Sequence, residues 1–220
     1  MDNENKLSEI MVDAYAHQKN GDLSFAIQSW NDLLKFEGVN KELQASAYLN
    51  LGNIHQQQGN HDLAFESMSS AINANPNSSE AYFCLAYIEQ EKGSLGSAIV
   101  FFEKALEINP SDSGAYNNLG NCYDLTGDTD RAINSYSMAI SIDDEYISAI
   151  YNRGNCYAKL GNNESALKDL SRAIELDENF YQAYYNRGTM LSRMGKLKES
   201  DQDLGKAKDL AQKELNSKTH

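Results

Sequence analysis

Asparagine is the polar residue that recurs at regular positions in this chain of 220 residues. A pair of positions three residues apart returns at a constant interval over most of the chain. Asparagine occupies seven of these sites: Asn50, Asn53, Asn118, Asn121, Asn152, Asn155 and Asn186. Residues three apart lie on one face of a helix, so these amides should form a stripe. A primary amide both donates and accepts hydrogen bonds, as a peptide unit does. The stripe therefore predicts a surface that binds the backbone of an extended peptide.

The same amides could instead only join neighbouring helices, and the sequence leaves both interpretations open. Tyr151 and Tyr185 each stand one residue before an asparagine of the stripe and could add flat aromatic contact area. They could equally pack between repeats. The candidate peptide-binding residues are thus the seven asparagines and these two tyrosines.

A periodic glycine indicates which elements position these side chains. One constant interval separates Gly59, Gly93, Gly127, Gly161 and Gly195, and Gly21 lies slightly further upstream of the first. A constant period of about 34 residues is typical of stacked repeats, each of which covers its apolar face only with a neighbour. Glycine can adopt the left-handed conformation that ends one helix. The residue that follows five of the six glycines is a good N-cap for the next helix, which predicts a pair of helices in each period.

We expect six repeats of two helices, which we call rows, and they begin at residues 7, 45, 79, 113, 147 and 181. First helices are predicted near 7–20, 41–58, 79–92, 113–126, 147–160 and 181–194, and second helices near 22–36, 60–74, 94–108, 128–142, 162–176 and 196–214. Four extra residues after the first row equal about one helical turn and should lengthen the first helix of the second row. The chain has no alternating β-rich run, so no sheet is expected.

Small residues recur at three further positions of the repeat, and a large apolar residue recurs at a fourth. We call each such recurring position a column. The first-helix column reads Ala14, Gly52, Ala86, Gly120, Gly154 and Gly188, and the large column of the second helices reads Trp30, Met68, Phe102, Tyr136, Leu170 and Leu204. Small residues let two helix backbones approach closely, and a large side chain fills the space beside them. These columns predict the packing within each repeat.

Several of these segments resemble the tetratricopeptide repeat family. The segments 45–52, 115–120 and 183–188 resemble its first-helix signature, and 105–110 resembles the end of its second helix. The resemblance covers about 7–214 and implies an all-α fold, a right-handed α-solenoid of stacked helix-turn-helix repeats. It implies one domain over 7–214 with tails at 1–6 and 215–220, and first helices that line a concave groove. The stripe is similar to the asparagine ladder of protein O-GlcNAc transferases, which holds peptide backbone regardless of sequence.

We therefore predict a non-enzymatic scaffold or adaptor that binds an extended peptide or partner segment in the concave groove. The alternative is a non-catalytic regulatory or scaffolding subunit of an enzyme or of an assembly or secretion complex. Some members of the family clamp a C-terminal carboxylate with cations at two slots of the first helix. These slots hold no cation in any row, so this clamp is not expected. Arg153 and Arg187 each come one residue after an asparagine of the stripe, and we expect them to form salt bridges between repeats.

The net charge of −13 is unevenly distributed along the chain. Residues 1–146 contain 22 acidic and 7 basic residues, whereas residues 147–220 contain 10 acidic and 12 basic ones. A solvated surface explains the acidic part, and a basic or bipolar partner is the alternative. No concentrated basic stripe exists, so nucleic-acid binding is not expected. No catalytic motif, phosphate loop or metal-ligand spacing is present, which predicts a protein that is not an enzyme and has no cofactor or metal.

The three cysteines, Cys84, Cys122 and Cys156, have no metal-ligand spacing and are expected in the core of a protein from a reducing cytoplasm. The first residues contain no apolar stretch for a signal peptide, and no segment is apolar enough to span a bilayer. We expect a cytoplasmic protein without membrane insertion and a monomer. Self-association through the first row, which departs most from the pattern, is the alternative.

Overall fold

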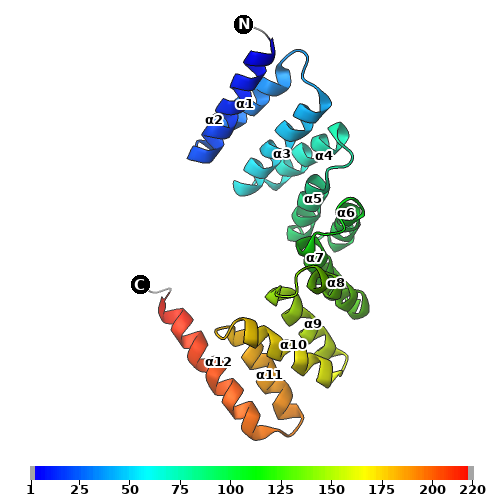
Figure 1. Ribbon diagram of the computed structural model, residues 1–220, viewed down its shortest axis with the longest axis vertical. Helices are drawn as coiled ribbons and strands as arrows, with labels where there is room; N and C mark the ends of the chain where they lie inside the picture. The colour runs from blue at the N-terminus through cyan, green and yellow to red at the C-terminus, as the bar shows by residue number, and fades with distance from the viewer. Residues whose placement is uncertain (1–2, 218–220) are drawn as a thin grey trace. The chain divides into compact units, whose positions relative to one another are not determined.

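The described part of the chain, residues 3–217 of the computed structural model, forms twelve helices in consecutive pairs and no strand (Figure 1). The first helices of the pairs are α1 (Asn3–Asn20), α3 (Lys41–Gln57), α5 (Ser79–Glu91), α7 (Ser113–Leu125), α9 (Ile147–Lys159) and α11 (Tyr181–Arg193). The second helices are α2 (Leu23–Lys35), α4 (His61–Ala74), α6 (Leu95–Ile108), α8 (Thr129–Ile142), α10 (Asn163–Leu176) and α12 (Leu197–Ser217). This arrangement confirms the all-α repeat fold.

The ends of the helices follow the prediction closely. α3 has 17 residues where α5 has 13, as the four extra residues predict. α1 begins at Asn3 and α12 ends at Ser217, so part of each predicted tail is helical. Residues 1, 2 and 218–220 of the predicted tails lie outside the described residues.

The chain divides into two compact units, residues 1–110 with α1–α6 and residues 111–220 with α7–α12. Within each unit the two helices of a repeat pack against each other, and each second helix packs against the first helix of the next repeat. In the second unit α9 also contacts α7 and α11, which places the first helices side by side. The single domain over 7–214 stays a prediction.

Glycine ends all six first helices in the predicted way. The φ angles of Gly21, Gly59, Gly93, Gly127, Gly161 and Gly195 lie between +75° and +86°. The next backbone N–H then bonds the carbonyl five residues back, as from Asp128 to Tyr123 at 2.9 Å. This bond closes the end of the helix and turns the chain into the second helix, because only glycine adopts this conformation without strain.

The residue after the glycine starts the second helix, but its side chain caps that helix in only some repeats. Asp128 and Asn162 accept hydrogen bonds from the backbone N–H three residues on. Asp22, Asn60 and Ser94 occupy the same position and make no such bond, so the prediction of capping side chains was wrong there. The amide of Asn60 instead donates to Gln58 at 3.2 Å.

The small and large columns meet in the core of each repeat. Every small residue of the first-helix column is buried, and the large residues from Trp30 to Leu170 are at most 1% exposed. A Cβ added to Gly52 would lie 2.6 Å from Cε of Met68, and one added to Gly120 would lie 2.6 Å from Cε1 of Tyr136. Gly120 therefore leaves the space that the buried ring of Tyr136 occupies, whereas alanine fills the same position opposite Trp30 and Phe102.

Replacing Gly120 by alanine should lower the free energy of unfolding by about 1–3 kcal/mol, because the buried ring of Tyr136 has no room to move away. Urea denaturation followed by circular dichroism measures this loss. The control is Gly96→Ala on α6, where an added Cβ meets nothing within 4 Å. Alanine favours helix over glycine by about 1 kcal/mol, so the control should be neutral or stabilising. Equal stability of the two variants would contradict the packing described.

Candidate functional site

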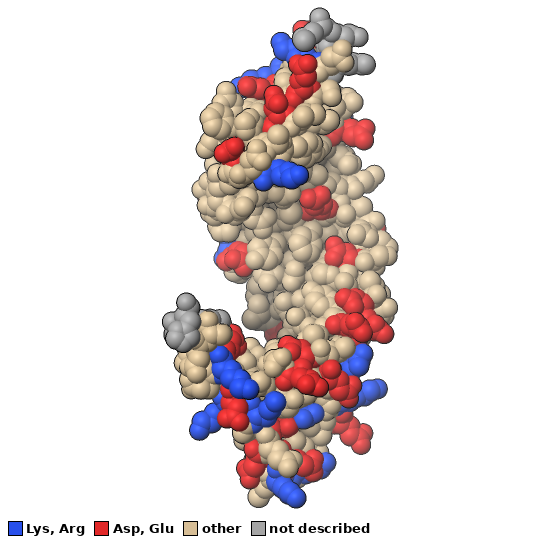
Figure 2. All heavy atoms as spheres, turned by 60° about the vertical axis from the view of Figure 1, so that its left-hand side comes forward, with Lys and Arg blue, Asp and Glu red and all other residues tan. Residues whose placement is uncertain are grey.

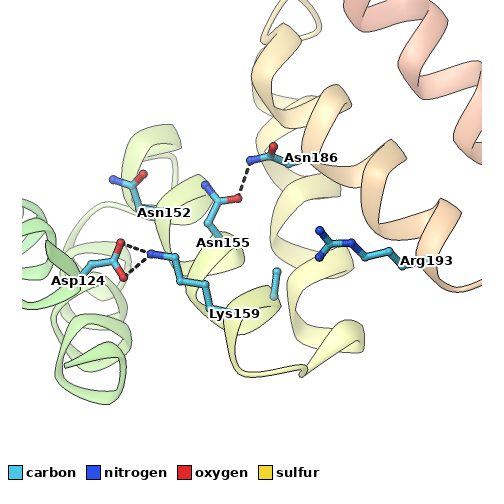
Figure 3. Close-up of a pocket in the computed structure, with 7 residues that line it drawn as sticks. Asp124, Asn152, Asn155, Lys159, Asn186 and Arg193 are labelled. Atoms are coloured by element: carbon cyan, nitrogen blue, oxygen red, sulfur yellow. Dashed lines mark hydrogen bonds and ion pairs between the residues drawn. The ribbon is translucent and has the colours of Figure 1, made fainter. Parts of the chain in front are cut away.

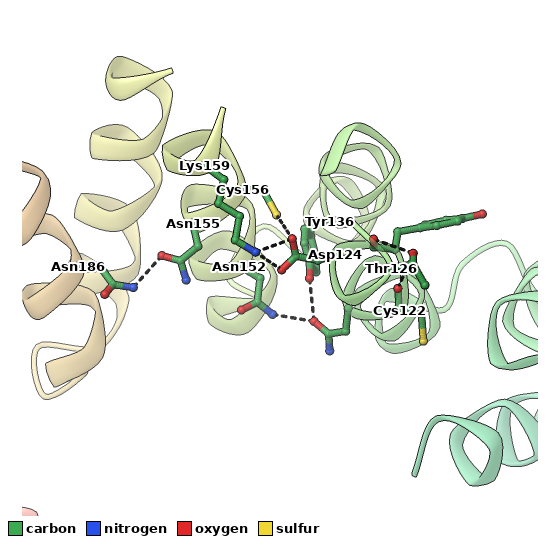
Figure 4. A network of polar contacts seen from close by, with 11 residues as sticks. Cys122, Asp124, Thr126, Tyr136, Asn152, Asn155, Cys156, Lys159 and Asn186 are labelled. Atoms are coloured by element: carbon green, nitrogen blue, oxygen red, sulfur yellow. Dashed lines mark hydrogen bonds and ion pairs between the residues drawn. The ribbon is translucent and has the colours of Figure 1, made fainter. Parts of the chain in front are cut away.

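The predicted amide stripe forms hydrogen-bonded rungs between the first helices of the second unit. The Oδ1 atom of Asn121 on α7 accepts a hydrogen bond from Nδ2 of Asn152 on α9 at 3.1 Å. The same oxygen accepts from the hydroxyl of Tyr136 at 2.8 Å. This rung ties two first helices to the large residue of the fourth repeat's core (Figure 4).

A second rung joins α9 to α11. Nδ2 of Asn186 donates to Oδ1 of Asn155 at 2.8 Å and to the hydroxyl oxygen of Tyr151 at 2.9 Å. The ring of Tyr151 also packs against Phe180, with centroids 4.8 Å apart. Figure 4 shows the amides of Asn155 and Asn186 facing each other across the two helices. Tyr151 is thus partly committed to packing between repeats.

The other predicted residues take no part in these rungs. Nδ2 of Asn53 donates to Glu80 of α5 at 3.2 Å, so in the first unit an amide bonds a carboxylate instead. Asn50 donates to the carbonyl of Ser46 in its own helix at 2.9 Å. Two further residues make no hydrogen bond to a neighbouring first helix among residues 3–217: Asn118, whose Oδ1 accepts from Asn117 at 3.5 Å, and Tyr185, which is 58% exposed.

Each rung uses only part of the hydrogen-bonding capacity of its two amides. Asn121 and Asn155 accept through Oδ1, and their NH2 groups have no acceptor among residues 3–217. Asn152 and Asn186 donate through Nδ2, and their Oδ1 atoms have no donor in the same part of the chain. Each amide therefore joins the helices through one of its two polar atoms and leaves the other without a partner among residues 3–217.

A pocket of about 370 Å³ adjoins both rungs (Figure 3). Its lining consists of amides, charged groups and one alanine: Asp124, Asn152, Asn155, Ala158, Lys159, Asn186 and Arg193. A second pocket of about 340 Å³ shares Asn155, Ala158, Asn186 and Arg193 with the first, and its lining also includes Leu170, Tyr185 and Met190. The second rung thus lies where two pockets meet, and the second of them includes the exposed ring of Tyr185 in its lining.

The sequence analysis missed the charged lining of the first pocket. Nζ of Lys159 lies 2.7 Å from both carboxylate oxygens of Asp124, and the thiol of Cys156 donates to the same carboxylate at 3.5 Å (Figure 4). Lys159 and Arg193 occupy the same position of successive repeats, at the C-terminal ends of α9 and α11. That shared column was the signal that could have revealed them.

Family models of the tetratricopeptide repeat match residues 45–78, 79–112, 101–134, 147–180 and 181–214. The first repeat and residues 135–146 lie outside these matches. The chain belongs to the tetratricopeptide repeat family. Proteins of this family bind protein partners, and its repeats make this protein an interaction scaffold in general terms.

Solved tetratricopeptide repeat structures have the same fold. MamA is 23% identical, with a TM-score of 0.72, and the match covers 76% of this chain and 97% of MamA. YrrB, described as a protein with an unusual peptide-binding site, is 21% identical, with a TM-score of 0.69 and coverage of 80% and 92%. A tetratricopeptide repeat protein from Parabacteroides merdae is 21% identical, with a TM-score of 0.76 and coverage of 92% and 78%. No curated protein sequence gives a significant match.

Two arginines of the first helices pair with buried carboxylates in a pattern shared by the last two repeats. Arg153 binds Asp169 through two nitrogens at 2.7 and 2.9 Å, and Arg187 binds Asp203 at 2.7 and 2.8 Å. The bond to each carboxylate raises the pKa of the arginine further above its usual range. Both salt bridges lie within one tetratricopeptide repeat, so the predicted salt bridges between repeats were wrong. The contact between repeats is a hydrogen bond from Arg153 to the hydroxyl of Ser137 at 3.1 Å, and Arg187 makes the equivalent bond at 3.0 Å.

The thiols are buried and stay protonated near neutral pH. Burial raises the pKa of Cys84 to about 12, of Cys122 to about 11 and of Cys156 to about 12. A thiolate is the nucleophilic form of cysteine, so these side chains are poor nucleophiles. Among residues 3–217 no group of three or more histidine, cysteine, aspartate or glutamate side chains is placed to hold a metal ion. In the same range no helix is both long and apolar enough to cross a membrane.

Replacing Asp169 by alanine should lower the free energy of unfolding by about 3 kcal/mol, because it leaves the half-buried guanidinium of Arg153 unpaired. The fourth repeat holds Leu119 and Ser135 at the corresponding positions. The double variant Arg153→Leu with Asp169→Ser should therefore recover most of the loss. Urea denaturation followed by circular dichroism compares them. A double variant as unstable as Asp169→Ala would contradict this assignment of the cost to an unpaired charge.

Proposed function

We propose that this tetratricopeptide repeat protein is a non-enzymatic adaptor that binds an extended peptide segment along α7, α9 and α11. The observation that carries the proposal is the unused half of each amide rung. Asn121 and Asn155 offer N–H donors, and Asn152 and Asn186 offer carbonyl acceptors. A peptide unit has one donor and one acceptor, so each rung complements one unit of the ligand backbone.

The spacing of the rungs suits an extended chain. Helices that pack side by side lie about 8–10 Å apart, and an extended strand rises about 3.3 Å per residue. One rung therefore corresponds to about three residues of the ligand. The residues between two bonded peptide units leave their side chains free to enter the pockets. Backbone recognition of this kind supplies affinity for many sequences, and the pockets supply the preference among them.

The pockets support a peptide as the ligand. The second pocket presents the exposed ring of Tyr185 to a ligand side chain, next to the amides of the second rung, and the buried side chains of Leu170 and Met190 lie beneath it. Aromatic residues provide large contact area at low entropic cost. The likeness to YrrB, described as having a peptide-binding site, supports the same class of ligand. Asn50, Asn53 and Asn118 stay predicted members of the groove.

The test keeps each rung intact and changes only the atom that faces the ligand. Asn155→Asp retains the oxygen that accepts from Asn186 but replaces the free NH2 group by an acceptor. Asn121→Asp does the same in the first rung. Peptides selected on the wild-type protein from a random library should bind either variant at least about tenfold more weakly, as measured by fluorescence anisotropy.

The matched control is Asn134→Asp on α8, an exposed asparagine that receives the same charge away from the rungs. It should bind the peptides as the wild type does, and all three variants should melt at similar temperatures. Unchanged affinity in Asn121→Asp and Asn155→Asp would show that the amides do not bind the ligand. A failure to select any peptide would also overturn the proposed function.

A further inference from the structure

The first helices α9 and α11 carry four cations and no acidic residue. Three of the cations are neutralised by carboxylates from other helices: Arg153 by Asp169, Arg187 by Asp203 and Lys159 by Asp124. Arg193 has no ion pair or hydrogen bond among residues 3–217. On the face seen in Figure 2, the helices of the second unit carry many basic side chains interspersed with acidic ones. Arg193 is thus the unpaired member of an otherwise neutralised set.

Arg193 also lines both pockets of the second rung. Figure 3 shows its guanidinium directed from α11 toward α9, into the space beside Asn155. Long side chains on a helix lean toward its N-terminus, which brings this group back toward Asn186. The pair of Lys159 and Asp124 on the opposite side adds no net charge. The pocket therefore combines one available cation with the unused NH2 group of Asn155.

We propose that Arg193 binds the carboxylate of an aspartate or glutamate side chain in the bound peptide. This inference rests on the proposed function, because it assumes a peptide backbone at the second rung. A guanidinium matches a carboxylate with two parallel hydrogen bonds, and such charge-assisted bonds are stronger than neutral ones. The charge is complementary, since the pocket holds two cations and one carboxylate. The acidic residue gives the otherwise sequence-independent rungs a preference for certain partners.

The position of Arg193 favours a side-chain carboxylate over the C-terminus of a peptide. Arg193 follows Asn186 by seven residues, which is about two turns or 10 Å along α11. A backbone held by the rungs passes across the helices, and Arg193 lies to the side of that path. A side chain projecting from the backbone reaches it, whereas a chain end in line with the amides does not. Arg193 itself occupies neither of the carboxylate-clamp slots, which hold Tyr185 and Asn186 on this helix.

The test uses two libraries of random peptides of about twelve residues, about 40 Å when extended. One library has free C-termini, and in the other the C-terminus is fused to the display protein. Both are selected on the wild type, on Arg193→Gln and on the control Arg172→Gln, which removes an exposed cation from α10. The wild type and the control should enrich aspartate or glutamate at one internal position in both libraries. Arg193→Gln should still select peptides but without that position.

A synthetic copy of a selected peptide gives the magnitude. Changing its acidic residue to the corresponding amide should weaken binding to the wild type at least about tenfold and binding to Arg193→Gln very little. Selected peptides with no acidic position would overturn this inference and leave the proposed function standing. The inference also fails if acidic enrichment persists on Arg193→Gln or is confined to free C-termini. If neither library yields a binder, both proposals fail.

Discussion

The close approach of the two helices in each repeat is the constraint on which the rest of the structure depends. Glycine at Gly120 lets the ring of Tyr136 lie against the first helix, at a distance where even a methyl group would clash. The hydroxyl of that ring then reaches Asn121 and fixes the amide that receives Asn152. Core packing therefore determines where the first rung lies and which of its atoms remain available.

The amides combine structure and recognition because each side chain has two different hydrogen-bonding ends. A half-buried amide needs hydrogen-bond partners, and each rung supplies one of its amides' two polar atoms with a partner between repeats and without a charged group. Charged groups follow a different rule in the same unit. Arg153 and Arg187 are neutralised by carboxylates inside their own repeats. Arg193 has no ion pair among residues 3–217 and lines the pocket. The first helices thus present amides and one cation, while the carboxylates that pair with their arginines come from the second helices.

Most of the fold could be predicted from the sequence, because glycine at a fixed period marks each turn and the small and large columns mark each helix pair. The site was predictable only in part. Side chains three residues apart share a face, so the amide columns were visible, but their bonds depend on distances between helices. The bond from Asn186 to Asn155 spans 31 residues, and no local pattern distinguishes it from the bond of Asn50 within its own helix. The pairing of Arg153 with Asp169, sixteen residues on, likewise required the packed repeat.

The most direct test of a dual role for the amides is nuclear magnetic resonance of the asparagine side chains in nitrogen-15-labelled protein. Addition of a selected peptide should shift the NH2 resonances of Asn121 and Asn155, which have no acceptor among residues 3–217. The NH2 resonance of Asn186, both of whose bonds lie within the protein, should move much less. Shifts confined to the second helices α8 and α10 would contradict the account, because the ligand would then bind away from the rungs.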